Sequence, residues 1–136
     1  MMNQSTASTV VASPTNQRGW RGPKVWLCLE GLAVLATAVT LYAQGGYSWW
    51  LFVALLLAPD LAMLGYLVNV RAGSLIYNLF HTYLLVLPYL GLAFITTSPW
   101  MLAIGLIWLA HIGMDRMLGY GLKYGDQFKH THLDEV

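Results

Sequence analysis

The chain has 136 residues, of which 57% are hydrophobic and only 10% carry a charge. Soluble domains average about 45–50% apolar and about 25% charged residues, and a small domain is mostly surface. The composition therefore excludes an ordinary soluble domain and indicates a membrane protein. The net charge is +1 with no dense basic stretch, so nucleic acid is not an expected partner. A single cysteine, Cys28, excludes an intrachain disulfide.

Residues 1–24 are rich in Ser, Thr, Asn and Gln and are predicted to form a disordered polar leader. Four long apolar runs follow, and each is close to the roughly 20 residues that a helix needs to cross a hydrocarbon core of about 30 Å. The expected transmembrane domain, residues 25–122, contains these spans at about 25–43, 47–68, 73–95 and 99–121. Residues 123–136 are expected to form a cytoplasmic tail.

Short connections between the runs require neighbouring helices to be antiparallel. The fold class is therefore predicted to be all-α, an integral membrane four-helix bundle of up-down-up-down topology. Pro59 and Pro88 lie inside the second and third spans, where each removes a backbone donor and should bend its helix. Ser98-Pro99 is a typical helix start, an N-cap followed by proline at the first helical position.

The distribution of charge predicts the orientation of the bundle. The loops near residues 44–46 and 96–98 contain no charged residue, whereas all lysines and arginines lie in the leader, the 69–72 loop, the end of the fourth span or the tail. Because positive charge marks the cytoplasmic side, both termini are expected to be cytoplasmic.

Five ionisable side chains lie inside the spans, namely Glu30, Asp60, His81, His111 and Asp115. A carboxylate at the centre of a membrane helix costs about 2.5–3.5 kcal/mol on insertion scales, so such groups need partners in the bundle interior. Counted from the helix ends, all five fall at the midplane or in the cytoplasmic half. They are therefore expected to form one polar layer.

The spacing within this layer suggests a metal site. His111 and Asp115 are separated by four residues and project from one face of a helix, and His81 follows Asn78 at three residues. Histidine nitrogens with carboxylate oxygens suit zinc, iron or manganese.

Two other interpretations of the same layer stay open. The groups could be hydrogen-bonded structural glue between helices, with Arg116 neutralising Asp115. They could also relay protons or an ion, because a desolvated carboxylate beside a histidine titrates near neutral pH. Such a relay would need a homo-oligomer, since four helices make a thin wall for a pathway.

Several longer motifs resemble a known family. They are Glu30-Gly-Leu-Ala, Tyr47-Ser-Trp-Trp, Ala58-Pro-Asp-Leu-Ala-Met-Leu-Gly-Tyr66, Gly73-x-x-x-Tyr77-Asn78-x-x-His81, His111-x-x-x-Asp115-Arg116-x-x-Gly119-Tyr120-Gly121-Leu122-Lys123-Tyr124 and Phe128-x-x-Thr131-His132-Leu133. Over about residues 27–133 the chain resembles the bacterial domain of unknown function 4260 family of small integral membrane proteins. The resemblance implies a compact membrane domain and favours a docked tail, but it brings no reaction or substrate. The chain departs from the family pattern at Thr82, where a second histidine is common, and at Asp134, where glycine is usual.

The working hypothesis is a multi-pass protein of the bacterial inner (plasma) membrane, where the lipid bilayer surrounds it. The protein is expected to bind a divalent metal ion, namely zinc, iron or manganese. The expected metal ligands are His81, His111, Asp115 and His132. Glu30 or Asp60 is the expected general base and Arg116 the group that holds an anionic part of a lipid-like substrate, in hydrolysis or oxidation. The expected supporting residues are Tyr77, Asn78 and Tyr120.

Overall fold

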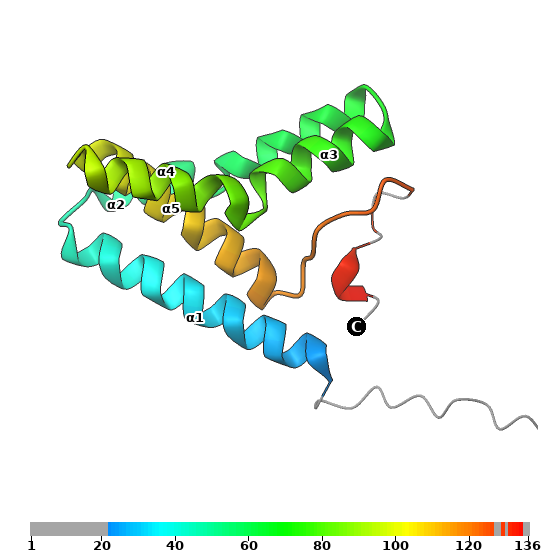
Figure 1. Cartoon of the computed structure of the whole chain (residues 1–136), viewed down its shortest axis with the longest axis horizontal. Coiled ribbons are helices and arrows are strands. Elements are labelled where there is room, and N and C mark those ends of the chain that lie inside the picture. Colours follow the sequence, from blue (N-terminus) through cyan, green and yellow to red (C-terminus); the bar gives the residue numbers. More distant parts are fainter. Residues whose placement is uncertain (1–21, 127–128, 130, 135–136) are drawn as a thin grey trace, which may run out of the picture.

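A computed structural model describes residues 22–126, 129 and 131–134, so the predicted leader lies outside the described residues except for its last three (Figure 1). Within the described part the regular structure is helical, and the one extended feature is an isolated bridge between Lys123 and Thr131. The prediction of an all-α protein is therefore confirmed.

The elements are, in chain order, α1 (Pro23–Gln44), α2 (Trp49–Leu55), the 3-10 helix η1 (Ala58–Leu67), α3 (Val70–Phe80), α4 (Tyr83–Ile95), α5 (Pro99–Met117) and the short 3-10 helix η2 (His132–Asp134). Three segments are long and apolar enough to cross a membrane: α1, α2 with η1 (Trp49–Leu67), and α3 with α4 (Val70–Ile95). The predicted fourth span forms α5 but is not among these three, because it carries His111, Asp115 and Arg116 near its end.

The second and third predicted spans are interrupted. The second changes from α-helix to 3-10 helix around Leu57, just ahead of Pro59, which lies in the first turn of η1. Proline disfavours the α conformation in the residue before it, so an interruption here is expected. The third is interrupted at His81, which ends α3 with non-helical angles, and at Thr82, which caps α4. Pro88 lies inside the continuous helix α4.

Helix α5 is the centre of the molecule. It packs against α1, α4 and α2, while α3 packs mainly against η1, so that α3 and η1 form a second arm in Figure 1. Small residues allow α1 and α5 to approach closely, since a Cβ atom built on Gly113 would lie 2.7 Å from the backbone nitrogen of Leu35. The core among α1, α2 and α5 is formed by Ala38, Tyr42, Phe52, Ala103, Leu106, Ile107 and Ala110.

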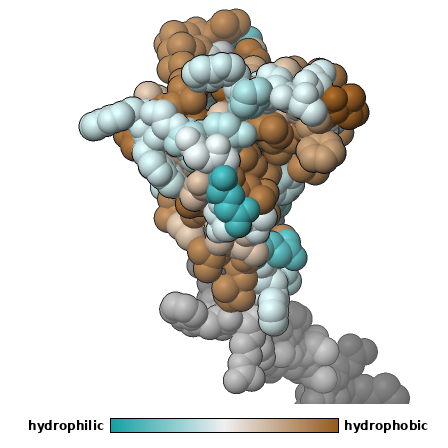
Figure 2. All heavy atoms as spheres, turned by 90° about the vertical axis from the view of Figure 1, so that its left-hand side faces the viewer, coloured by the Kyte–Doolittle hydropathy of each residue, from teal (hydrophilic) through white to brown (hydrophobic). Residues whose placement is uncertain are grey.

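The outer surface is largely apolar. Trp50 is 85% exposed, Leu67 84% and Ile95 79%. Figure 2, which views the left-hand side of Figure 1, shows hydrophobic side chains over much of that face. Soluble monomers rarely expose apolar surface on this scale, whereas a helical protein in lipid needs it.

The C-terminal segment returns to the helices. Leu122 and His132 exchange two hydrogen bonds, from the Leu122 amide to the His132 ring Nδ1 at 2.8 Å and from the His132 amide to the Leu122 carbonyl at 3.0 Å. Leu133 is fully buried. The described part of the tail is therefore packed against the domain rather than extended from it.

Candidate metal centre

Four ionisable side chains converge where the two interrupted segments meet α5. Asp60 comes from the first turn of η1, His81 from the end of α3, and His111 and Asp115 from successive turns of α5. One ligand atom of each lies within 4.8 Å of the corresponding atoms of the others. The interruptions of the backbone thus lie at the polar site, where α5 packs against them.

Each histidine Nε2 atom lies 3.0–3.7 Å from the other three ligand atoms, and all four atoms lie within 4.8 Å of one another. The Nε2 atoms of His81 and His111 are 3.0 Å apart. His81 Nε2 lies 3.3 Å from Asp60 Oδ1 and 3.6 Å from Asp115 Oδ2. His111 Nε2 lies 3.6 Å from Asp60 Oδ1 and 3.7 Å from Asp115 Oδ2. Ligands about 2.0–2.2 Å from a central ion in a tetrahedron are roughly 3.3–3.6 Å from one another, so the nitrogen–oxygen distances fit a zinc-sized ion.

The local backbone fixes the ring of His81. The amide of His81 and its ring Nδ1 both contact the carbonyl oxygen of Tyr77, at 2.9 and 2.8 Å. Because a carbonyl only accepts, Nδ1 carries the hydrogen, and Nε2 of the neutral ring presents its lone pair to the cluster. The Tyr77 ring stacks on the His81 ring with centroids 3.7 Å apart. Metal-binding histidines are commonly oriented by such a hydrogen bond from the second nitrogen.

Helix α5 also caps the carbonyls that the end of α3 leaves without helical partners. Trp108 Nε1 donates to the carbonyl of Phe80 at 2.7 Å, and Arg116 Nη2 donates to the carbonyl of His81 at 3.4 Å. Free carbonyls at a helix end need such partners when they are buried. The interruption is therefore part of the packed structure, and it holds His81 against α5.

Burial differs among the four residues. His81 and His111 are 3% and 0% exposed, whereas the side chains of Asp115 and Asp60 are 13% and 33% exposed. Tyr77 Oη donates to Asp115 Oδ2 at 3.1 Å and fixes that carboxylate. Solvent or a substrate therefore reaches the cluster most easily at Asp60.

The donor set calls for a positive charge at its centre. Two carboxylate oxygens and the lone pair of His81 Nε2 face one another, and all three are acceptors. His111 Nδ1 is buried and has no hydrogen-bond partner among the described residues. A divalent cation would balance both carboxylates and use all the nitrogen and oxygen atoms as ligands.

The other residues predicted for the site lie around this centre or away from it. Glu30 is exposed on α1 and is not part of the group. His132 also lies outside it, with Nδ1 used by the Leu122 amide. Tyr120 is 59% exposed. Arg116 is half-buried, and its Nη1 is buried without a hydrogen-bond partner among the described residues.

Asn78 holds the tail near the site by binding Lys123, a residue that the sequence analysis missed. Its Nδ2 donates to the Lys123 carbonyl at 2.8 Å and its Oδ1 accepts from the Lys123 amide at 2.7 Å. The Lys123 side chain then reaches the ring of Tyr77, with Nζ 4.4 Å from the centroid. Lys123 lies within the longest of the motifs that resemble the family, and this was the signal in the sequence that could have identified it.

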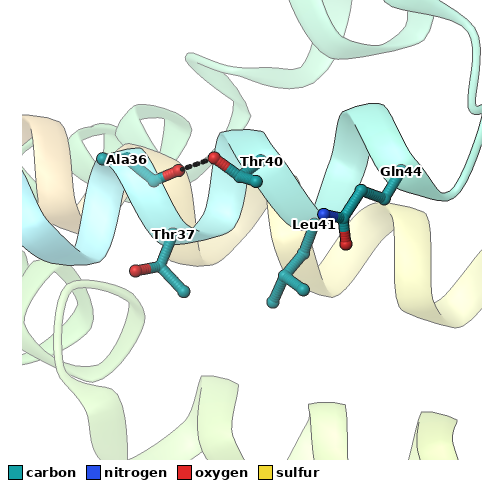
Figure 3. A pocket seen from close by; sticks show the side chains of 5 residues that line it. All are labelled: Ala36, Thr37, Thr40, Leu41 and Gln44. Atoms are coloured by element: carbon teal, nitrogen blue, oxygen red, sulfur yellow. Dashed lines mark hydrogen bonds between the residues drawn. The ribbon is translucent and has the colours of Figure 1, made fainter.

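A separate pocket lies on α1, lined by Ala36, Thr37, Thr40, Leu41 and Gln44 (Figure 3). Both threonine hydroxyls donate to carbonyls of their own helix at 2.8 Å, Thr37 to Ala33 and Thr40 to Ala36. Its threonines are therefore already engaged, and the pocket contains none of the four clustered residues.

Comparison with known proteins agrees with the resemblance seen in the motifs. No curated protein and no solved structure matches the chain. A family does match, and it covers residues 24–136, which include every residue of the cluster. The chain belongs to the family described as Domain of unknown function (DUF4260).

Proposed function

We propose that this chain is a small multi-pass membrane protein whose cluster of Asp60, His81, His111 and Asp115 binds one divalent metal ion. The observation that carries the proposal is that the two imidazole nitrogens lie 3.0 Å from each other and 3.3–3.7 Å from the two carboxylate oxygens, with His81 Nε2 aimed at the other three atoms. This spacing suits zinc best, and the same donors accept iron or manganese.

The burial of each residue suggests its role. His81, His111 and Asp115 are the permanent ligands, since they are the least exposed and two of them lie on the rigid helix α5. Asp60 is more exposed and lies on a 3-10 helix, so it is the ligand that gives way to water or substrate and the best-placed general base. Glu30, which the sequence offered for the same role, is not part of the group.

The proposed reaction is hydrolysis of a lipid-like substrate, or oxidation if the ion is iron or manganese. A metal ion held by these residues would supply Lewis-acid activation of water and of an ester group. The chain itself would orient the substrate. Arg116 has a buried Nη1 without a partner among the described residues, and an anionic substrate group would satisfy it.

The proposed topology is up-down-up-down with both termini cytoplasmic, in the inner membrane of a bacterium. In support, the two charge-free loops, residues 44–46 and 96–98, lie at the same end of the molecule (Figure 1). Arg71 and the basic residues of the tail lie in segments at the other end. This separation agrees with the positive-inside rule.

The test is elemental analysis of protein purified in detergent without chelators. We expect stoichiometric zinc, iron or manganese in the wild type and in the control Glu30→Gln, and its loss in His111→Ala/Asp115→Ala. A wild type without stoichiometric metal would overturn the proposal. If such metal-free protein in liposomes still carries protons down a pH gradient, the cluster is a relay instead.

A further inference from the structure

Helix η1 keeps the 3-10 form over ten residues. At its start the Asp60 amide donates to the Leu57 carbonyl, three residues back, at 3.1 Å. At its end the Val68 amide donates to the Gly65 carbonyl, also at 3.1 Å. Hydrogen bonds in a 3-10 helix have poorer geometry than in an α-helix, so runs beyond three or four residues are uncommon, and one inside a longer helical segment often marks a hinge. Contacts with the rest of the molecule are therefore needed to favour this form.

Two contacts with α3 supply this support, one near each end of η1. At the start of η1, Asp60 Oδ1 lies 3.3 Å from Nε2 of His81, the residue that ends α3. Near its other end the Tyr66 ring packs on Gly73 and leaves no room there for a Cβ atom, and the Tyr66 hydroxyl lies 3.2 Å from that of Ser74. Ser74 and His81 are seven residues apart, about two turns of α-helix, so they share one face of α3. Helix η1 must therefore present Asp60 and Tyr66 to the same side.

The 3-10 winding meets this requirement and an α-helix does not. Asp60 and Tyr66 are six residues apart. With 3.0 residues per turn, roughly two full turns separate them, so their side chains point the same way. With about 100° per residue, as in an α-helix, they would point about 120° apart. An α-helical η1 that kept Tyr66 on α3 would therefore turn Asp60 away from the two histidines.

We propose that η1 is a conformational switch gated by the metal ion: the bound ion holds it as a 3-10 helix, and release of the ion lets it become α-helical and turn Asp60 out of the cluster. The inference rests on the proposed function and describes the regulation of the same site. Carboxylate oxygens of Asp60 and Asp115 lie within 4.8 Å of each other, and they repel when no cation lies between them. Asp60 is the most exposed of the four residues, at 33%, and Pro59 would lie in the first turn of the new α-helix, where its missing amide is tolerated. An ion that binds one of two forms shifts the equilibrium toward that form.

The test measures the length of η1 by dipolar electron paramagnetic resonance, with and without zinc. In a full-length Cys28→Ala background, spin labels are attached at Leu57→Cys and Leu67→Cys, which are 59% and 84% exposed. Ten residues rise about 20 Å in a 3-10 helix and about 15 Å in an α-helix, so removing zinc with a chelator should shorten the distance between the labels by about 5 Å, and adding zinc should restore it. The control pair, Leu29→Cys and Leu41→Cys on the exposed side of α1, should keep its distance.

Elemental analysis of the same labelled samples separates the two proposals. Protein that binds zinc but keeps the same η1 distance after its removal would overturn the switch and leave the metal centre standing. Protein that takes up no zinc would overturn both, and a change in the control pair as well would show a general loosening instead of a switch. Asp60→Ala, which removes the contact with His81, should show the shorter η1 distance with and without zinc. The longer distance in zinc-treated Asp60→Ala would also overturn the switch, because Asp60 would then not be what holds η1.

Discussion

The Nε2 atoms of His81 and His111 lie 3.0 Å apart, although the residues are 30 positions apart in the sequence. His81 reaches this position because α3 ends there, and His111 because it is fully buried on α5. Two carboxylates complete the group within 4.8 Å. The packing of an interrupted helix against a continuous one therefore creates the site.

Tyr77 should act as a positioning residue for this group. Its hydroxyl donates to Asp115 Oδ2 at 3.1 Å and its carbonyl accepts from the His81 ring. In Tyr77→Phe the carbonyl and the stacked ring stay and only the hydroxyl is lost, so we expect metal affinity to fall about 10–100-fold. Competition with a chromophoric chelator measures the change.

The control for this prediction is Tyr66→Phe. It removes a hydroxyl of the same kind, which contacts the Ser74 hydroxyl at 3.2 Å. Metal affinity should be unchanged in this variant. Equal metal affinity in Tyr77→Phe and the wild type would show that Asp115 needs no such support.

Asn78 should hold the tail segment against α3. Asn78→Ala removes two hydrogen bonds to the Lys123 backbone, and we expect a loss of about 1–3 kcal/mol of stability with faster hydrogen exchange at the Lys123 amide. Asn69→Ala is the matched control, because Asn69 Oδ1 caps α3 through the Ala72 amide. Losing that cap should cost about 0.5–2 kcal/mol but leave the Lys123 amide protected. Mass spectrometry of exchanged peptides distinguishes the two, and unchanged exchange in Asn78→Ala would contradict the prediction.

The proposed orientation predicts which sites a membrane-impermeant maleimide labels in intact cells. In a Cys28→Ala background, Ser48→Cys should be labelled, because its loop is charge-free and exposed. Lys129→Cys, in the exposed part of the tail, should be labelled only after the cells are opened. The reverse pattern would place both termini outside.

Much of the fold could be predicted from the sequence because the length of an apolar run depends only on the local sequence. The helical segments follow from it, and the start of α5 at Pro99 follows from the Ser98 N-cap and the proline after it. The interruption at His81 and Thr82 could not be predicted, since it depends on Trp108 and Arg116 of α5 to cap the freed carbonyls. Proline was the local signal for a break, yet Pro88 lies inside α4.

Four of the five residues predicted for the polar layer come together, whereas Glu30 does not, because the rotation of a helix could not be predicted. Residues adjacent on a helix point about 100° apart, so an error of one position moves a side chain off the buried face. Gly31 faces α5, where an added Cβ would meet Arg116, and Glu30 beside it is therefore turned outward. Asp60 is part of the group, and it lies on a 3-10 helix rather than on the expected α-helix.

The close contact of α1 with α5 gives a last prediction, on the role of α1 as scaffold. In Gly113→Ala the new methyl group would lie 2.7 Å from the Leu35 amide nitrogen and 3.0 Å from the Gly31 carbonyl oxygen. These are backbone atoms, so α1 must move away from α5, at a cost of roughly 1–3 kcal/mol. We expect a lower melting temperature in detergent, together with full metal content below the melt, because α1 contributes none of the four clustered residues.

The matched control is Gly91→Ala on α4, where nothing lies within 4 Å of the added Cβ. Alanine is the better helix former by about 0.8–1.0 kcal/mol, so this variant should melt at or above the temperature of the wild type. If Gly113→Ala melts like Gly91→Ala, the two helices are not in the tight contact described. If Gly113→Ala loses metal while still folded, then moving α1 away from α5 also displaces His111, which is two residues from Gly113. Helix α1 would then help to position a metal ligand in addition to supporting α5.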